Sequence, residues 1–396
     1  MQIHTRYREP GGEDVAVHAE RRLLTDAGHE VKTLEFENAA GTLRALRQLA
    51  ASPWNARSAH RATEAVQGFR PDVVHVHNTW FAASPAVLYG ARRSRTAVLM
   101  TLHNFRLGCV NGLLFRDGVV CEDCVGSHPW HGVLHRCYRG SAGASAVAAT
   151  QIALHRRLGS WSALVDMFIA LSRFSIPRHV ANGVPGERIV LKHNHVDDPG
   201  PRELPPSAAR DVLFVGRLSA EKGLERLVDA WGQAAPEGLR LVLVGDGPMR
   251  ARLAENTTPN VEVRGLATAD EVMRRMLHAR ALVVPSEWYE GQPMVVLEAL
   301  SAGLPVMGSD IGGLAEVLAE APHCWRIPPS DTGAWTRALA ELRDDRVDVA
   351  GREARDLYER KYATRVALDD LLGAYRTAIE WRGAGGAASP TAHPRA

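Results

Sequence analysis

The chain has 396 residues, with 47 lysines and arginines against 45 aspartates and glutamates, and 45% of its residues are hydrophobic. This ordinary globular composition excludes a collagen, a chain disordered along its whole length and a small disulfide-stapled protein. The formal net charge of +2 argues against nucleic acid as a main partner, because proteins that bind it carry a clear basic excess. At about 150 residues per domain, the length favours two or three domains.

The sequence also bears on the cellular compartment. It contains no run of the ~20 apolar residues that a membrane-spanning helix needs, and its first residues are polar. We therefore expect a cytoplasmic protein with reduced thiols. Arg156 and Arg157 end an apolar stretch, which would suit peripheral contact with the inner face of a membrane; a solvated helix face is the alternative.

Short apolar runs alternate along the chain with stretches of helical periodicity. Runs of about four to six residues rich in Val, Ile and Leu are typical of strands buried on both faces of a parallel sheet. The alternation predicts an α/β protein whose parallel sheets are covered by helices on both sides. The predicted strands lie within residues 73–77, 97–103, 166–172, 188–194, 211–216, 239–245, 260–265 and 281–286.

A proline-rich stretch without helical or strand periodicity predicts a linker at 197–209. It separates a Rossmann-like N-terminal domain at 1–196 from a Rossmann-like C-terminal domain at 210–361. A further helix is predicted at 362–382. The tail at 383–396 has too few large apolar residues to pack, and we expect it to be disordered.

Basic and glycine-rich motifs follow several predicted strands of the C-terminal domain. In GRLSAEKG, at 216–223, Arg217 and Lys222 flank a turn that opens a helix, which favours anion binding; a loop with two solvated charges is the alternative. In VGDGPMR, at 244–250, two glycines permit a tight turn and Pro248 suits the first position of a helix.

The segment EWYEGQPMVVLEALSAGLPV, at 287–306, contains two notable carboxylates. Pro293 is expected to start a helix, so that the preceding amides could bind phosphate or sugar oxygens. Glu290 lies just before this helix. Glu298 lies inside its apolar sequence, where it could accept paired ribose hydroxyls or face water. The amides concerned belong to Gly291, Gln292 and Met294.

Together these motifs resemble the retaining glycosyltransferases of family four, in which two Rossmann-like domains with parallel sheets face each other across a cleft, the GT-B fold. Gly11–Gly12 and the HVHN at 75–78 fit the same family. The segment 101–126 resembles a subset of the family from bacterial polysaccharide pathways. Only Ile3 is a large apolar residue in the first predicted strand, so either this strand is short or the sequence starts late.

The resemblance implies a catalytic set of residues. Arg217 and Lys222 would neutralise the diphosphate of a nucleoside-diphosphate-sugar donor. Glu290 would bind hydroxyls of the donor sugar, and His103 would point at this sugar. The alternative for His103 is a structural histidine at the end of a core strand.

The resemblance also implies a donor-binding set. Glu298 would bind the ribose, Gly12 would approach the diphosphate, and residues near 264–266 would lie beside the base. The complete set is Gly12, Glu298, Gly291, Gln292, Met294, Gly265 and Leu266.

The reaction implied is transfer to a hydroxyl of a glycan or lipid-linked acceptor, with retention of configuration. No metal-binding acidic pair of the DxD type stands at a predicted strand end in the C-terminal half, so we expect no catalytic metal or other cofactor. Two alternatives remain at this stage: a GT-B sugar-nucleotide epimerase, and a non-catalytic interaction protein stapled by a metal.

Four cysteines form an insert at about 107–138, spaced C-x11-C-x2-C-x12-C. This spacing favours a structural zinc ion bound by thiolates. The alternatives are four reduced thiols or, less favoured, a redox-active pair, because the acidic residues inside CEDC would raise the thiol pKa values. Cys324 is expected in a core strand. The insert cysteines are Cys109, Cys121, Cys124 and Cys137.

Overall fold

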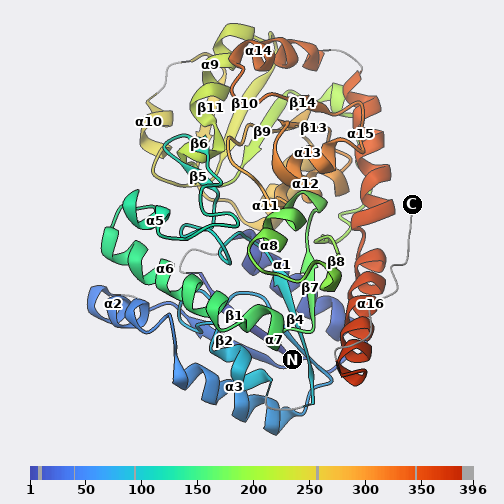
Figure 1. Cartoon of the computed structure of the whole chain (residues 1–396). Helices are drawn as coiled ribbons and strands as arrows, with labels where there is room; N and C mark the ends of the chain where they lie inside the picture. Colours follow the sequence, from blue (N-terminus) through green and yellow to red (C-terminus); the bar gives the residue numbers. More distant parts are fainter. Residues whose placement is uncertain (8–10, 40, 93–94, 256–257, 344–345, 386–396) are drawn as a thin grey trace. The chain divides into compact units, whose positions relative to one another are not determined.

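The structure is a computed structural model that describes residues 1–7, 11–39, 41–92, 95–255, 258–343 and 346–385 (Figure 1). These residues form two compact units. The first unit comprises Met1–Leu114, Cys121–Lys192 and the segment that begins at Leu368, and the second comprises Phe115–Val120 and His193–Ala367. Most of the tail predicted to be disordered lies outside the described residues.

The first unit contains a six-stranded parallel sheet with the order β2-β1-β3-β4-β7-β8. The first strand is not short, in contrast to one of the two interpretations of its sequence: it has five residues, more than β3, β7 or β8, and it pairs with both β2 and β3. The other predicted strands of this half form where expected. The strands are β1 (Gln2–Arg6), β2 (Thr33–Glu37), β3 (Val73–Val76), β4 (Ala97–Leu102), β7 (Met167–Ala170) and β8 (Ile189–Leu191).

Side chains of this sheet alternate between two faces, as the period of a strand requires. Val74 and Val76 of β3 join the apolar cluster that packs against α3 (Ala56–Phe69), α4 (Val87–Ala91) and α7 (Ser160–Leu164). His75, between them, meets α1 (Gly12–Asp26) and α16 (Thr364–Gly383) instead. The unit also contains α2 (Thr42–Ala50), α5 (His131–Leu134), α6 (Ala142–Arg157) and α8 (Ile176–Ala181).

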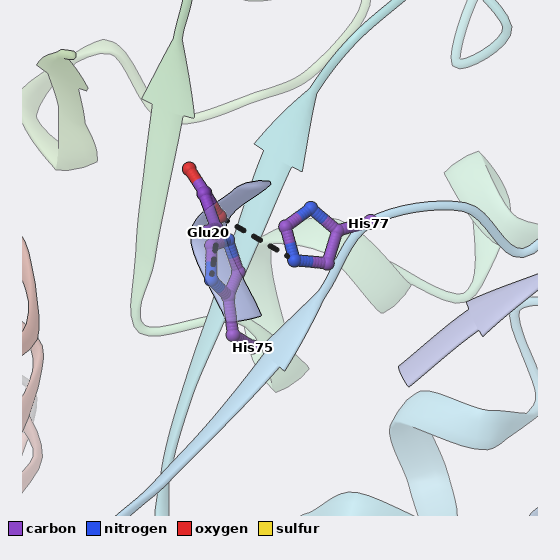
Figure 2. A group of neighbouring side chains, drawn as sticks. All are labelled: Glu20, His75 and His77. Atoms are coloured by element: carbon purple, nitrogen blue, oxygen red, sulfur yellow. Dashed lines mark ion pairs between the residues drawn. The ribbon is translucent and has the colours of Figure 1, made fainter. Parts of the chain in front are cut away.

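A buried polar cluster joins α1, α16 and the sheet. Figure 2 shows three of its members, Glu20, His75 and His77. The ammonium of Lys192, just after β8, contacts Glu20 of α1, and both side chains are almost fully buried. The same carboxylate lies 3.7 Å from His75 Nδ1 and 3.6 Å from His77 Nε2. His75 Nδ1 is 3.0 Å from the hydroxyl of Tyr375 on α16. Burial lowers the pKa of both histidines well below the usual value, so both imidazoles are neutral near pH 7. The charges of the cluster therefore lie on Lys192 and Glu20.

The second unit contains another six-stranded parallel sheet, with the order β11-β10-β9-β12-β13-β14, so the prediction of an α/β chain with two parallel sheets is confirmed. The strand order reverses between β9 and β12. Loops that leave two such strands diverge and open a crevice at their carboxyl ends. The strands are β9 (Asp211–Val215), β10 (Arg240–Val244), β11 (Val261–Arg264), β12 (Ala281–Val284), β13 (Val306–Ser309) and β14 (Trp325–Ile327).

Helices cover this sheet in the expected alternation, with two local corrections. Pro248 does not open a helix, because α10 begins only at Arg250. Cys324 is buried but precedes β14 instead of lying within a strand. The helices are α9 (Leu224–Ala234), α10 (Arg250–Ala254), α11 (Ala269–Leu277), α12 (Met294–Ser301), α13 (Gly312–Leu318), α14 (Thr332–Ala340) and α15 (Arg346–Leu357).

No helix among the described residues combines the length and hydropathy needed to cross a bilayer. The arginine pair that suggested membrane contact ends α6. Arg156 donates a hydrogen bond of 2.6 Å to the carbonyl of Ser127 within its own unit, and the guanidinium also contacts Asn182. The Arg156 side chain is therefore engaged in packing the first unit.

We expect Lys192→Met to reduce the free energy of unfolding by about 3–5 kcal/mol, because it leaves the Glu20 carboxylate buried without its ammonium partner. The double variant Glu20→Leu/Lys192→Met should lose less than the sum of the single losses. Urea unfolding followed by circular dichroism measures both. As a control, Lys361→Met removes a half-buried, solvent-accessible ion pair with Glu320 and should cost under ~1 kcal/mol. Additive losses in the buried pair would contradict this account.

Candidate functional site

The loops after β9 and β12 pack directly against each other at the carboxyl edge of the second sheet. Gly223 has a φ of +68°, and a Cβ there would lie 2.0 Å from the carbonyl oxygen of Pro285. The start of α13 approaches just as closely, since a Cβ on Gly313 would lie 1.9 Å from the carbonyl oxygen of Gly291. Glycine is required at both positions because backbone meets backbone.

Two of the predicted site residues meet in this packed edge. Lys222 Nζ lies 2.6 Å from Glu290 Oε1, although 68 positions separate them in the chain. The same oxygen accepts hydrogen bonds from Ser286 Oγ at 2.8 Å and from Trp288 Nε1 at 3.1 Å. The Lys222 ammonium also lies 5.2 Å from the centroid of the Trp288 ring. Three donors therefore fix one carboxylate oxygen, and Oε2 makes no hydrogen bond to any described residue.

The helix that follows begins as predicted. Pro293 is the N-cap of α12, whose first residue is Met294. Just before it, Gln292 uses its side chain within its own unit: Oε1 accepts from the Asn194 amide at 2.6 Å, and Nε2 lies 2.9 Å from His193 Nδ1. The sequence suggested only an amide role for Gln292. The side chain in fact anchors the segment that enters the second unit.

Glu298 lies on α12 and is half-buried. Burial raises the pKa of its carboxyl group. It makes no ion pair or side-chain hydrogen bond with any residue that the structure describes. Its role in ribose binding stays a prediction.

The remaining predicted residues of the second unit lie at other points of the same sheet edge. Arg217 follows β9 and is exposed. Gly265 follows β11, and its carbonyl accepts a 3.2 Å hydrogen bond from the amide of Gly245 after β10. Leu266 beside it is 81% exposed. The structure thus brings Lys222 and Glu290 into direct contact.

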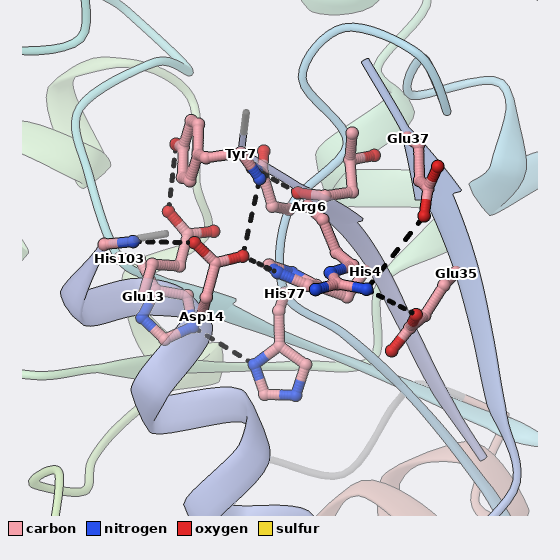
Figure 3. A network of polar contacts seen from close by, with 12 residues as sticks. His4, Arg6, Tyr7, Glu13, Asp14, Glu35, Glu37, His77 and His103 are labelled. Atoms are coloured by element: carbon pink, nitrogen blue, oxygen red, sulfur yellow. Dashed lines mark hydrogen bonds and ion pairs between the residues drawn. The ribbon is translucent and has the colours of Figure 1, made fainter. Parts of the chain in front are cut away.

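The first unit has its own polar cluster where β1 meets the start of α1 (Figure 3). Asp14 Oδ1 lies 2.8 Å from His4 Nε2, and its Oδ2 accepts a 2.9 Å hydrogen bond from the Gly11 amide. Asp14 thereby holds Gly11, the N-cap residue of α1. Gly12, the first residue of this helix, is exposed, and its approach to a ligand stays a prediction.

Glu13, the next residue of α1, was not identified from the sequence. Its Oε2 accepts hydrogen bonds from the Tyr7 hydroxyl at 3.0 Å and from Asn104 Nδ2 at 3.2 Å, whereas Oε1 is buried without a hydrogen-bond partner. Burial raises the pKa of this carboxyl group to about 7, against the opposing effects of His4 and other neighbours. An acidic residue at the start of a helix usually faces water, so the residue type gave no indication that Glu13 is buried. Only its position directly after Gly11–Gly12 indicated a place in the site.

His103 follows β4, and its Nε2 lies 3.1 Å from Nδ1 of His77. Burial lowers the pKa of His103 to about 3. The imidazole is therefore neutral near pH 7 and is a weak base there. It can give or accept a hydrogen bond, but proton abstraction by His103 is disfavoured.

Comparison with known proteins agrees with this geometry. Residues 10–198 match the model of Glycosyltransferase Family 4, and residues 209–345 match that of Glycosyl transferases group 1. The 2-deoxystreptamine N-acetyl-D-glucosaminyltransferase of Streptomyces fradiae is 30% identical over 326 residues, which are 78% of this chain and 68% of the relative. The chain belongs to the group 1 glycosyltransferases.

Other relatives are matched over different shares of their length. The GDP-mannose-dependent alpha-mannosyltransferase of Mycobacterium tuberculosis is 29% identical to this glycosyltransferase over 80% of the chain and 75% of the relative. Two further curated relatives are matched over 46% and 45% of their own length, so the chain spans about half of each. A crystal structure of HepE from Anabaena with UDP has a TM-score of 0.67 at 16% identity, covering 95% of this chain and 99% of that one. This likeness shows the GT-B fold.

Among the residues described in this glycosyltransferase, a single group of His, Cys, Asp and Glu side chains has its potential metal-ligand atoms within 4.8 Å of one another: Glu20, His75 and His77 (Figure 2). The Lys192 ammonium already contacts Glu20. A cation placed beside it would be repelled at close range in a poorly screened interior. The group therefore suits the internal ion pair better than a metal.

Glu13→Gln should stabilise the glycosyltransferase at about pH 8 and have little effect at about pH 5. The folded-state pKa is raised to about 7 from 4.5, so the stability linked to the bound proton is complete below pH 4.5 and lost as pH rises through 7. Glutamine cannot ionise and avoids this loss. Thermal unfolding at both pH values measures the difference, with the exposed Glu225→Gln as control. An equal shift at both pH values would refute the raised pKa.

Proposed function

We propose that this glycosyltransferase moves a sugar from a nucleoside diphosphate donor to a hydroxyl of a glycan or lipid-linked acceptor. The observation that carries the proposal is the Lys222–Glu290 pair, held at the strand-order reversal of the second sheet. Open parallel sheets bind nucleotides at this point. The likeness of segment 101–126 to transferases of bacterial polysaccharide pathways supports polysaccharide or glycoconjugate assembly as the setting.

The proposed chemistry begins with departure of the nucleoside diphosphate. As the bond to the sugar breaks, negative charge grows on the diphosphate. Lys222, Arg217 and the amides around Gly291 would stabilise this charge, and groups already fixed in place need little rearrangement to do so. Lys222 has ammonium protons beyond the one directed at Glu290, so it can serve both groups.

Two carboxylates would orient the donor. Glu290 keeps Oε1 fixed by three donors and can offer Oε2 to a sugar hydroxyl. Glu298 is half-buried and has no described hydrogen-bond partner. A pair of ribose hydroxyls would replace the hydrogen bonds to water that this carboxylate loses on burial. Leu266 offers an exposed apolar surface that would suit the base.

We further propose that transfer retains configuration and needs no divalent ion. Arg217 and Lys222 would supply the positive charge that a metal provides in other transferases. The acceptor hydroxyl would attack from the face that the diphosphate leaves, and the departing phosphate oxygen would take its proton. The neutral His103, with its low pKa, is consistent with this role for the phosphate.

The test of donor binding is a thermal-shift panel of UDP, GDP, ADP and dTDP sugars. We expect the sugars of one base to stabilise the protein, by ~2.7 kcal/mol at 100 times the dissociation constant. Lys222→Ala should abolish the shift. Arg252→Ala, which removes a cation whose side chain is 75% exposed in the same unit, should preserve it. Absence of a shift with every nucleotide sugar would refute the proposal.

With the donor known, Glu298→Ala should reduce kcat/KM by at least ~10²-fold in buffer freed of divalent ions on a chelating resin. The control Glu225→Ala should not reduce it.

Added Mg²⁺ or Mn²⁺ should leave the wild-type rate unchanged. NMR of the product should show the anomeric configuration of the donor. A rate that depends on added metal, or an inverted product, would contradict the mechanism. Epimerisation of the donor without acceptor would favour a sugar-nucleotide epimerase.

A further inference from the structure

Exposed apolar side chains gather on one part of the first unit. Of the twelve large hydrophobic side chains that are exposed in the described part of the chain, six belong to α2, to α5 or to residues beside α2, α5 and α6. Single exposed hydrophobic residues are normal on a protein surface, whereas a group of them usually marks an interaction site. We call this group the α2–α5 surface; its apolar members are Leu43, Leu46, Trp54, Trp130, Leu134 and Leu158.

Packing on α6 brings the elements of the α2–α5 surface together. Both α2 and α5 contact α6, and Figure 1 shows them beside it. Leu49 of α2 and Ile152 of α6 belong to one buried apolar cluster, against which Val133 of α5 packs. Trp54, after α2, stacks on His155 of α6 with 5.9 Å between the ring centroids. These contacts hold the elements in place while other apolar side chains on them stay exposed.

Helix α2 places leucines and arginines on the protein surface. Leu49 is buried, but Leu43 is 63% exposed and Leu46 is 57% exposed. Arg44 and Arg47, which follow these two leucines in the sequence, are exposed as well. Exposed leucines combined with basic residues and no acidic residue are typical of a helix that lies in the interface of a membrane.

Helix α5 adds a second exposed apolar group. Leu134 at its end is 77% exposed, and its N-cap residue Trp130 is exposed too. Trp54 and Trp130 are the two exposed tryptophans among the described residues. An indole ring combines an apolar body with an N–H donor, so it suits the boundary between lipid headgroups and acyl chains.

Helix α5 belongs to the cysteine insert, which has little regular structure. The insert also contains a hairpin of β5 (Phe115–Arg116) and β6 (Val119–Val120). None of the five cysteines, all of which the structure describes, forms a disulfide. Zinc binding by the insert stays a prediction.

The sequence around the α2–α5 surface is basic throughout. Residues 38–63 and 125–165 contain eight arginines and no aspartate or glutamate, although the whole chain has 47 basic against 45 acidic residues. Two acidic residues near the ends of these stretches, Glu37 and Glu122, contact Arg6 and Arg178. The surface therefore carries positive charge that is not compensated within these stretches. Its exposed arginines include Arg44, Arg47, Arg136 and Arg139.

We propose that the α2–α5 surface docks the protein on an anionic lipid bilayer. The leucines and tryptophans would enter the boundary between headgroups and acyl chains, and the arginines would contact lipid phosphates. A second copy of this chain fits less well, because a symmetric contact would place arginines against arginines. Nucleic acid would engage the arginines but would leave the leucines without an apolar partner.

Docking would bring the first unit close to substrates held in a bilayer. The surface adjoins Arg156 and Arg157, at which the sequence suggested membrane contact. Of the acceptor classes proposed above, docking favours the lipid-linked one, and this consequence rests on the proposed function. Vesicle binding itself is measured without donor or acceptor, so failure of docking and failure of sugar transfer are separate results.

The first experiment is co-sedimentation of the full-length protein with vesicles. We expect binding to phosphatidylcholine vesicles that contain about 30 mol % phosphatidylglycerol, weak binding to pure phosphatidylcholine, and weaker binding as the salt concentration rises. Absence of binding to the anionic vesicles at low salt would overturn the proposal. Equal binding to both kinds of vesicle would also overturn it, because the arginines would then have no role.

Variants of exposed residues locate the docking surface. Arg44→Gln/Arg47→Gln should weaken binding to the anionic vesicles by about 30-fold, because each arginine near such a surface contributes roughly fivefold. Leu134→Ser should weaken it by about tenfold through the loss of apolar burial. These side chains are exposed, so the substitutions should have little effect on folding.

Matched controls use exposed residues of the second unit. Arg252→Gln/Arg274→Gln removes two exposed arginines, and Leu204→Ser removes a leucine that is exposed to a similar degree as Leu43. Both control proteins should bind the vesicles as the wild type does. If the control substitutions weaken binding as much as those on α2 and α5, the assigned surface is wrong.

A second measurement uses the wild-type protein and tests the depth of contact. Vesicles with brominated acyl chains should quench part of the tryptophan fluorescence, and Trp130→Phe should reduce the quenched fraction. Co-sedimentation without quenching would refute insertion by this surface. A wild-type dimer that Leu134→Ser dissociates would assign the surface to a second copy, and DNA binding in place of vesicle binding would assign it to nucleic acid; either result would overturn the proposal.

Discussion

The contact between the Lys222 ammonium and the Glu290 carboxylate depends on the adjacency of β9 and β12. Only because the second sheet reverses its strand order there do loops that are distant in sequence leave the same edge side by side. Glycines at 223 and 313 then allow the loop backbones to touch. The charged pair is thus a consequence of topology, and the donor chemistry that we propose rests on that topology.

Burial gives three glutamates of this chain different properties. Glu290 is almost fully buried but has three hydrogen-bond donors on one oxygen. Glu298 is partly buried without a described partner, and burial raises its pKa. Glu13 has two donors on one oxygen, yet burial raises its pKa to about 7. For Glu13, two donors on one oxygen do not offset the desolvation of the carboxyl group.

Much of the fold could be predicted from local patterns. The runs of Val, Ile and Leu marked strands in both sheets, because a strand buried on both faces must be apolar throughout. Pro293 marked the start of α12 because its missing amide costs nothing there. Pro248 misled for the same reason: its ring also fits a turn, and α10 begins two residues later. Local chemistry permits a proline both at the start of a helix and in a turn, and tertiary packing decides between the two.

By itself, the sequence determined the two-sheet α/β plan, the family resemblance and the candidate residues for anion binding, since these follow from side-chain type and spacing. Only the tertiary structure decided that Lys222 meets Glu290, that Gln292 anchors the segment at His193, and that His103 is neutral. Glu13 belongs with these, because desolvation is a sum over neighbours from distant parts of the chain. No local sequence pattern contains this sum of desolvation effects. The charge state of each group could therefore be assigned only from the folded structure.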